Sequence, residues 1–249
     1  MQLNESVSTR RQLKLGVRVA ETAEDIRRAQ KLRFDVFAGE MGAELSSQQL
    51  GIDCDEYDAL CDHLIVEDAN SGLVVGTYRM LPPDMARRAP SLYSEHEFDL
   101  TRLDNLRDGL IEVGRSCVHK DFRSGGVIAL LWSGLADYVQ KKGGEYLAGC
   151  ASVSLADGGH QAVSLYRQLE TSHLSPAEWR VFPHLPLPLD RIQDDAASSP
   201  MPPLIKGYLR AGAFICGEPA WDPDFNCADF FMLLPMSRLT GRYNRHFVG

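Results

Sequence analysis

The chain has 249 residues and a formal net charge of −8, with 44% hydrophobic and 24% charged residues, a composition typical of a globular protein with a substantial core. No apolar run is long enough for a membrane-spanning helix, and the polar N-terminus lacks the apolar stretch of a secretory signal, so we expect a cytoplasmic protein. The negative net charge argues against nucleic acid as a partner.

Basic residues gather near the two ends of the chain, around a segment, 16–236, in which we expect a single domain. They are Arg10, Arg11, Lys14 and Arg18 at one end, and Arg238, Arg242, Arg245 and His246 at the other. We expect segments 1–15 and 237–249 to be flexible. One interpretation is that these ends are solvated. The other is that they dock on an anionic carrier protein or on a lipid surface, which would include transient contact with the inner membrane.

Six cysteines occur without the spacing of metal ligands, so we expect reduced thiols and no structural metal. The alternative is a metal site in one acidic segment. Cys54 and Cys61 lie there among carboxylates and one histidine, namely Asp53, Asp55, Asp58, Asp62 and His63. Such residue types can bind zinc.

The first third of the chain predicts a strand, a helix, a loop and a hairpin, at residues 16–19, 24–37, 37–61, 63–67 and 73–81. The helix carries apolar residues at helical spacing and has Thr22 as its N-cap. The loop is rich in Gly, Ser and Asp. The hairpin turns at residues 68–72, and Pro82 and Pro83 end its second strand.

The remaining chain predicts strands at 110–118 and 146–154, helices at 127–142 and 161–169, and closing strands at 205–214 and 229–234. Seven prolines between residues 172 and 203 predict an irregular surface insertion before the last strands. The order of the elements predicts an α/β domain with a mixed central sheet flanked by helices.

A glycine turn, Arg123-Ser124-Gly125-Gly126, joins the strand at 110–118 to the helix at 127–142. A helix N-terminus offers unpaired N–H groups, glycines allow close approach of a phosphate, and Arg123 adds a positive charge. We therefore expect a site for the phosphate of coenzyme A or of a phosphopantetheine arm. The alternative is a turn that only caps a core helix, since such short motifs are weakly specific.

Glu112 and Arg115 are three residues apart in the strand before this turn, and that odd spacing predicts that they point to opposite faces of the sheet. Charged residues in a buried strand usually have a partner or a task. An amine attacks a thioester only when unprotonated, so Glu112 is our candidate for the general base. The alternative is a structural ion pair between Glu112 and Arg115 or Arg79.

The glycine turn resembles the pyrophosphate loop of GCN5-related N-acetyltransferases. Further motifs resemble those of acyl-homoserine lactone synthases, namely Leu32-Arg33-Phe34-Asp35-Val36-Phe37, Asp55-Glu56-Tyr57-Asp58, Arg79, Glu112 and Arg115. The fullest resemblance is to the ornithine-acyl carrier protein N-acyltransferases, often labelled hemolysin-like. It covers Cys61–Leu64, Tyr93–Asp99, Glu112–Val118 and the tail from Ile205 through Asp222 and Phe225 to Phe230.

This resemblance implies a GCN5-related acyltransferase fold. It also implies transfer of a 3-hydroxy fatty acyl group to the α-amino group of L-ornithine, which gives lyso-ornithine lipid. The donor would be acyl carrier protein, through its phosphopantetheine arm, with no bound cofactor.

Glu112 and Arg115 are then the catalytic candidates. Arg33, Arg79 and Arg115 would bind the substrate carboxylate or the acyl hydroxyl, the carboxylates of Asp55, Asp58 and Asp62 would bind ammonium groups, and Phe37 would contact the acyl chain. The alternatives are a solvated acidic loop and plain helix packing.

Three other functions remain open from the sequence. The first is an acyl-homoserine lactone synthase, which would use S-adenosylmethionine, or another N-acyl amino acid synthase. The second is a coenzyme A-dependent N-acetyltransferase. The third is a catalytically silent module that docks carrier protein. We expect direct transfer to the amine, because no Ser-His-Asp or Cys-His constellation stands out.

Overall fold

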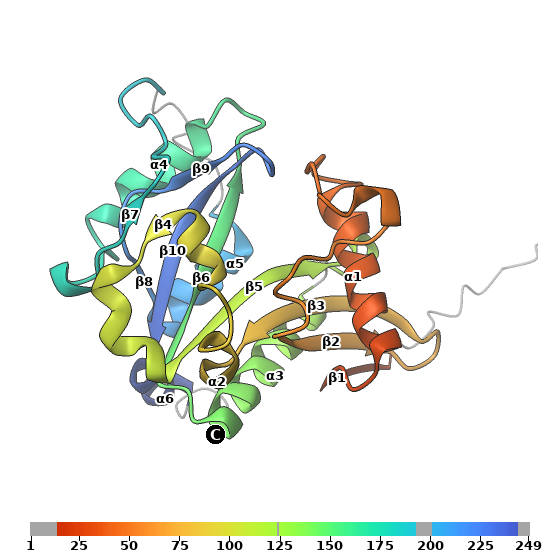
Figure 1. The fold of residues 1–249 in the computed structure, drawn as a ribbon. Coiled ribbons are helices and arrows are strands. Elements are labelled where there is room, and N and C mark those ends of the chain that lie inside the picture. The colour runs from red at the N-terminus through yellow and green to blue at the C-terminus, as the bar shows by residue number, and fades with distance from the viewer. Residues whose placement is uncertain (1–13, 124, 193–200, 244–249) are drawn as a thin grey trace, which may run out of the picture.

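Residues 14–123, 125–192 and 201–243 are described by the computed structural model, and they contain an eight-stranded sheet (Figure 1). Its strand order is β1-β2-β3-β5-β6-β10-β8, with β9 also paired to β10. The strands are β1 Leu15–Val19, β2 Asp62–Asp68, β3 Leu73–Leu81, β5 Leu110–Val118, β6 Tyr146–Ser154, β8 Phe214–Ile215, β9 Ala220–Asp222 and β10 Cys227–Pro235. Only β5 and β6 pair in parallel among these strands, so the predicted mixed sheet is confirmed.

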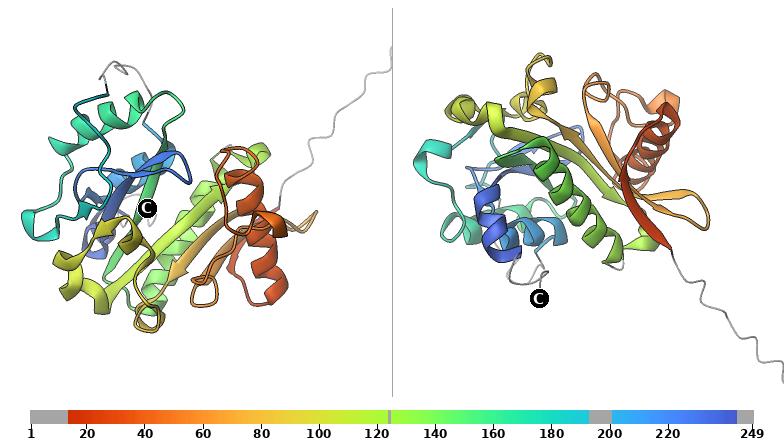
Figure 2. Two further views of the ribbon diagram at one scale, coloured as in Figure 1. Left: turned by 45° about the horizontal axis from the view of Figure 1, so that its top comes forward. Right: turned by 90° about the horizontal axis from the view of Figure 1, so that it is seen from below.

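Helices cover both faces of the sheet (Figure 2). They are α1 Ala23–Phe37, α2 Pro83–Ala86, α3 Gly126–Lys142, α4 His160–Glu170, α5 Pro203–Ala211 and α6 Met236–Tyr243. On β2, Ile65 packs in the cluster of α1, whereas its neighbours Leu64 and Val66 pack in the cluster of α3. Because side chains alternate along a strand, α1 and α3 lie on opposite faces.

The first helix begins as the sequence predicts. The Thr22 hydroxyl accepts a hydrogen bond from the N–H of Asp25, and the Asp25 carboxylate accepts one from the N–H of Thr22. This capping box satisfies two backbone donors that a helix N-terminus otherwise leaves open.

The prediction of a closing strand at 205–214 is wrong. Residues Pro203–Ala211 form α5, and the strand there is the short β8. Ile205, Tyr208 and Leu209 are the buried residues of α5, and their spacing of three and four residues matches a helical face. Pro203 stands in the first turn of α5, where its missing N–H costs nothing.

Short elements connect the main ones. The 3-10 helices Tyr93–His96 and Thr101–Gly109 fill the segment between α2 and β5, and a two-stranded ladder joins β4 Phe98–Asp99 to β7 Phe182–Pro183. The proline-rich segment is otherwise largely irregular, as expected, where it is described. α6 occupies the start of the segment predicted to be flexible, and residues 1–13 and 244–249 lie outside the described residues.

In the part of the chain that the structure describes, no helix combines the length and apolarity needed to cross a membrane.

The two parallel strands separate soon after they begin (Figure 1). β5 pairs with β6 only through Leu110–Glu112 and their partners Tyr146–Ala148. At the next residue of β6, Gly149, an added Cβ would lie 2.0 Å from the carbonyl oxygen of Val113. Glycine is therefore required where the strands still touch, and beyond it the sheet opens.

Candidate active site

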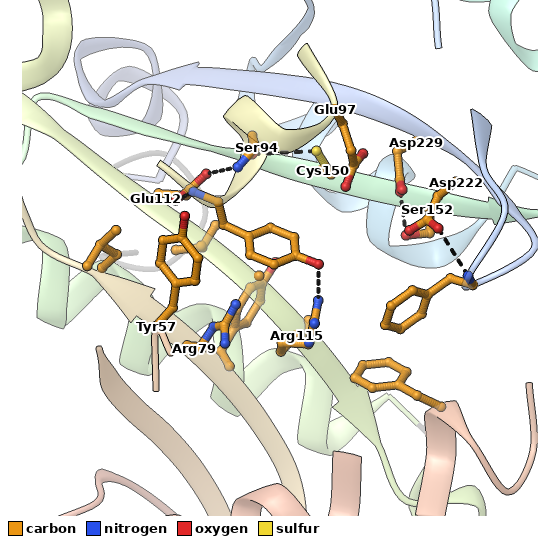
Figure 3. Close-up of a pocket in the computed structure, with 18 of the residues that line it drawn as sticks. Tyr57, Arg79, Ser94, Glu97, Glu112, Arg115, Cys150, Ser152, Asp222 and Asp229 are labelled. Carbon is orange, nitrogen blue, oxygen red and sulfur yellow. Dashed lines mark hydrogen bonds between the residues drawn. The ribbon is translucent and has the colours of Figure 1, made fainter. Parts of the chain in front are cut away.

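A cavity of about 260 Å³ lies where β5 separates from β6 and β10 (Figure 3). β3 contributes Arg79, β5 contributes Glu112 and Arg115, and β10 contributes Asp229. The segment from the 3-10 helix Tyr93–His96 to Glu97 covers one side. A cavity at a split between strands, with a few convergent charged groups, is the usual form of a small-molecule site.

A β-bulge puts Arg115 into this cavity. Thr77 of β3 pairs with Cys117 of β5, but Arg79, two residues later on β3, pairs with Gly114, three residues earlier on β5. Arg115 lies in the bulge and has a φ of 51°. This is a left-handed conformation, which is uncommon for residues other than glycine.

Glu112 and Arg115 consequently line the same cavity, and the prediction that they point to opposite faces is wrong.

Glu112 is buried and ties the covering segment to β5. Its carboxylate accepts hydrogen bonds from the N–H groups of Tyr93 and Ser94, at 2.7 and 2.8 Å. It forms no ion pair with a described residue, so neither pairing that the sequence suggested, with Arg115 or with Arg79, is present. Burial raises the pKa of this carboxyl, although the hydrogen bonds from Ser94 and Tyr93 oppose that shift. A carboxyl of raised pKa facing a cavity suits proton transfer.

Three arginines and three aspartates form one network behind the cavity. Arg33 binds Asp53 through Nε at 2.7 Å and clamps Asp58 through Nη1 and Nη2, at 2.8 and 2.9 Å. Arg79 donates from Nη1 to Asp55 at 2.6 Å. Arg115 donates from Nε to Asp53 at 3.1 Å and from Nη1 to the hydroxyl of Tyr93 at 3.0 Å.

The network favours the ionised form of Asp58. Burial opposes ionisation of Asp58, but the hydrogen bonds and charge of Arg33 outweigh it and keep the pKa of that carboxyl below its usual value. Arg33 is fully buried and donates to Asp53 and Asp58. It therefore orients the network and does not reach the cavity.

The structure brings only some of the predicted binding residues together. Phe37 and Arg79 line the cavity, whereas Arg33, Asp58 and Asp62 do not. Asp62 instead accepts a hydrogen bond from the Tyr138 hydroxyl and pairs with Lys142 at 3.1 Å. Asp55 bridges Arg79 and Arg115. Asp53, Asp55 and Asp58 thus pair with arginines, and the binding of an ammonium group by Asp55, Asp58 and Asp62 stays a prediction.

Carboxylates at the other end of the cavity were missed by the sequence analysis: Glu97, Asp222 and Asp229. Asp229 is 3% exposed in a strand whose other residues are all apolar, and the Ser152 hydroxyl donates to it at 2.6 Å. Two signals were available: a lone aspartate in an apolar strand, and the place of all three residues in segments that resemble the family.

Glu97 and Asp229 share one electrostatic environment. Burial, with the nearby charge of Asp229, raises the pKa of the Glu97 carboxyl from 4.5 to about 9. Burial also raises the pKa of Asp229. Ionising both carboxyls of such a pair is unfavourable, so the pair keeps one proton unless a cation compensates the second negative charge.

One group of possible metal ligands occurs in the described residues, and it overlaps this acidic end: Asp222, Cys227 and Asp229, whose ligand atoms lie within 4.8 Å of one another. No such group forms around Cys54 and Cys61 within the same residues. All six cysteines are free thiols.

The glycine turn lies at the amino end of α3, which is exposed. Gly125 has a φ of 99° and Gly126 is the first residue of the helix. Arg123 donates to the carbonyl of Val118 at 3.1 Å and pairs with Glu40 at 2.7 Å. Ser124 lies outside the described residues. The role of this turn in phosphate binding stays a prediction.

Comparison with known proteins identifies others with a similar architecture. The model of the acetyltransferase (GNAT) domain matches residues 32–133. Among solved structures, a CoA-dependent acyl-homoserine lactone synthase is 16% identical with a TM-score of 0.55, over 93% of this chain and 89% of its own. An N-acyl amino acid synthase from uncultured soil microbes is 10% identical with a TM-score of 0.53, over 92% and 94% of the two chains. These likenesses confirm the predicted fold.

Sequence relatives are more specific. A protein of Brucella abortus named L-ornithine N(alpha)-acyltransferase is 36% identical, over 94% of this chain and 88% of its own length. A protein of the same name from Rhodobacter capsulatus is 36% identical over 95% of both chains. The chain, with its GNAT-like sheet, therefore belongs to the L-ornithine N(alpha)-acyltransferase family.

Proposed function

We propose that the protein transfers a 3-hydroxy fatty acyl group from acyl carrier protein to the α-amino group of L-ornithine and so forms lyso-ornithine lipid. The observation that carries this proposal is the cavity between β5 and β6, where guanidinium groups and the buried carboxylate of Glu112 face one space. The names of the relatives support ornithine as the acceptor.

Arg79 and Arg115 bind the α-carboxylate of ornithine in this proposal. Arg79 lines the cavity, and its Nε and Nη2 form no hydrogen bond with the described residues, so donors remain for a ligand. A guanidinium group binds a carboxylate through two parallel hydrogen bonds. The network of Asp53, Asp55 and Asp58 fixes both arginines in place before the substrate arrives.

Glu112 removes a proton from the α-ammonium group, directly or through a water molecule. The N–H groups of Tyr93 and Ser94 and the Ser94 side chain leave part of the acceptor capacity of this carboxylate for that purpose. The neutral amine then attacks the thioester carbonyl, a C–N bond forms, and the C–S bond breaks. The sulfur leaves as the thiol of the phosphopantetheine arm, taking up the proton that the nitrogen loses as the amide forms.

The donor approaches from the apolar part of the cavity. Phe37 and Phe225 meet there edge to face, with ring centroids 5.9 Å apart, and Met41 and Leu204 complete that wall. In the proposal this wall holds the start of the acyl chain. The turn Arg123-Ser124-Gly125-Gly126 binds the phosphate of the arm, and no cofactor resides in the protein.

The test is a thioester-cleavage assay with purified protein. 3-Hydroxyacyl carrier protein is mixed with L-ornithine, released thiol is followed by its reaction with a chromogenic disulfide, and the product is identified by mass spectrometry. We expect an ornithine amide acylated at the α-nitrogen. Parallel reactions with acetyl-coenzyme A, and with S-adenosylmethionine as acceptor, cover the alternatives, and turnover with either of these but none with ornithine overturns the proposal.

A further inference from the structure

The acidic end of the cavity carries negative charge without a compensating cation (Figure 3). Glu97 follows the 3-10 helix, Asp222 ends β9, and Asp229 lies in β10. Among the residues that the structure describes, no arginine, lysine or histidine pairs with any of the three. The hydrogen-bond donors that do reach the pair Asp222 and Asp229 are neutral: backbone N–H groups, one hydroxyl and one thiol.

Glu97 shows most directly that a partner belongs here. Glu97 lines the cavity, and its buried Oε2 atom has no hydrogen-bond partner among the described residues. Leaving a buried acceptor unpaired costs about 1–3 kcal/mol, and more for a charged group. Asp229, next to it, is nearly inaccessible to solvent. Water in bulk therefore does not relieve the two carboxylates, whereas a ligand in the cavity can.

The two ends of the cavity have opposite character. Figure 3 shows Glu97, Asp222 and Asp229 together at one end, with Arg115 and Arg79 toward the other. A molecule that matches this layout carries a carboxylate at one end and a cation at the other. The cation must be a strong hydrogen-bond donor, since it faces several carboxylate oxygens, and an ammonium group offers three donors.

We propose that Glu97, Asp222 and Asp229 bind the side-chain ammonium group of the acceptor amino acid. This inference rests on the function proposed above, and it assigns the residues that choose between the two amines of ornithine. With the side-chain ammonium held at the acidic end, the α-amino group stays beside the carboxylate that Arg79 and Arg115 bind. It therefore lies at the end of the cavity where Glu112 is found.

The subsite also predicts which amino acids are rejected. Norvaline has the carbon chain of ornithine without the terminal amine, so its binding leaves the three carboxylates without a cation and the Glu97 Oε2 atom without a hydrogen-bond partner. A site built to hydrogen-bond a missing group discriminates strongly, by factors of about 10⁴ in the best cases. We expect at least about a hundredfold preference in kcat/KM for ornithine over norvaline, because Glu97 can still keep a proton when norvaline is bound.

The experiment compares ornithine with norvaline, at a fixed concentration of 3-hydroxyacyl carrier protein, in the wild type and in Glu97→Gln and Asp229→Asn. Both variants keep the shape of the side chain and remove its charge. We expect kcat/KM for ornithine to fall by about a hundredfold and that for norvaline to stay within a few-fold, so the preference collapses. Asp99→Asn, an exposed charge two residues from Glu97, is the matched control and keeps the preference.

Norvaline turnover reports on folding and on the chemical step in each variant, so a general loss of activity is separated from a loss of preference. The inference is overturned if Glu97→Gln turns over norvaline normally and still prefers ornithine as the wild type does. It is also overturned if the preference disappears on treatment with a chelator and returns with a divalent cation, because the cluster Asp222, Cys227 and Asp229 is then a metal site. A wild type that acylates neither amino acid contradicts the proposed function itself.

Discussion

Arg33 stabilises the protein without touching the cavity. Its guanidinium group donates two hydrogen bonds to Asp58, and no other cation among the described residues does so. It also donates to Asp53. Removing one partner of a buried ion pair leaves the other charge unpaired, which costs about 3–5 kcal/mol. We therefore predict that Arg33→Met lowers the free energy of unfolding by that amount, measured by urea denaturation.

The matched control for Arg33→Met is Lys31→Met on the same helix, where an exposed lysine pairs with Asp35. Exposed pairs contribute at most about 1 kcal/mol, so this variant should unfold close to the wild type. Equal midpoints for the two variants would show that the buried network does not support the fold.

Glu112→Gln tests the general base. We predict a fall in kcat of about 10²–10⁴, the usual contribution of a positioned proton acceptor, and loss of the acidic limb that Glu112 gives to the pH profile of kcat/KM. The variant also weakens one of the two hydrogen bonds to Tyr93 and Ser94, so the covering 3-10 helix loosens.

Glu95→Gln separates that loosening from the chemistry. Glu95 accepts a hydrogen bond from the N–H of Leu92, the N-cap residue of the same 3-10 helix, and pairs with Arg107, but it does not line the cavity. If Glu95→Gln lowers kcat as much as Glu112→Gln does, Glu112 acts by positioning the helix and not by accepting a proton.

At the scale of single elements, β5 and β6 make their last close contact at Gly149, and the cavity lies beyond it. Any Cβ at Gly149 meets the carbonyl of Val113, so Gly149→Ala must push the two strands apart where they last touch. Overpacking of this kind costs about 1–3 kcal/mol. We predict a lower melting temperature for Gly149→Ala, measured by calorimetry.

The control is Gly114→Ala on the neighbouring strand, where a Cβ has no atom within 4 Å. That variant should melt near the wild type. A Gly149→Ala protein that melts like Gly114→Ala would mean that the strand contact is looser than the geometry indicates.

Elements with a strong local pattern were predicted well, and the others were not. β5 and β6 have the predicted bounds, and α3 begins one residue earlier than predicted. The segment at 205–211 was misread because a short apolar run fits both a strand and a helix. The bulge at Arg115 has no local signal, since it depends on how β3 and β5 align in space.

The same division explains which site residues were found. Four residues that belong to family motifs line the cavity: Phe37, Arg79, Glu112 and Arg115. The acidic end needs residues from two distant parts of the chain, Glu97 and the paired strands that carry Asp222 and Asp229, and only the fold brings them together. Arg33, Asp58 and Asp62 were predicted as binding residues but do not line the cavity, because burial and ion pairs, which a sequence does not display, decide which side chains reach it.

On the scale of the whole molecule, the uncompensated carboxylates should appear in the dependence of stability on pH. The folded protein keeps a proton on Glu97 up to about pH 9, whereas an unfolded chain loses it near 4.5. Because the folded state then binds more protons, stability falls as pH rises between those values. The slope is at most about 1.4 kcal/mol per pH unit for each extra proton.

The most informative window is from about pH 6.5 to about pH 8, which begins at the usual histidine pKa and ends below that of thiols. There we predict that the unliganded wild type loses about 2 kcal/mol of unfolding free energy, measured by denaturant titration at each pH. Glu97→Gln removes the titrating group and should flatten the curve. Glu95→Gln should shift the curve without flattening it, because hydrogen bonds from Arg107 and Leu92 outweigh burial and keep the pKa of Glu95 below its usual value. Parallel curves for the wild type and Glu97→Gln would show that the pair Glu97 and Asp229 holds no proton in this window, and that the acidic end is more hydrated than its burial indicates.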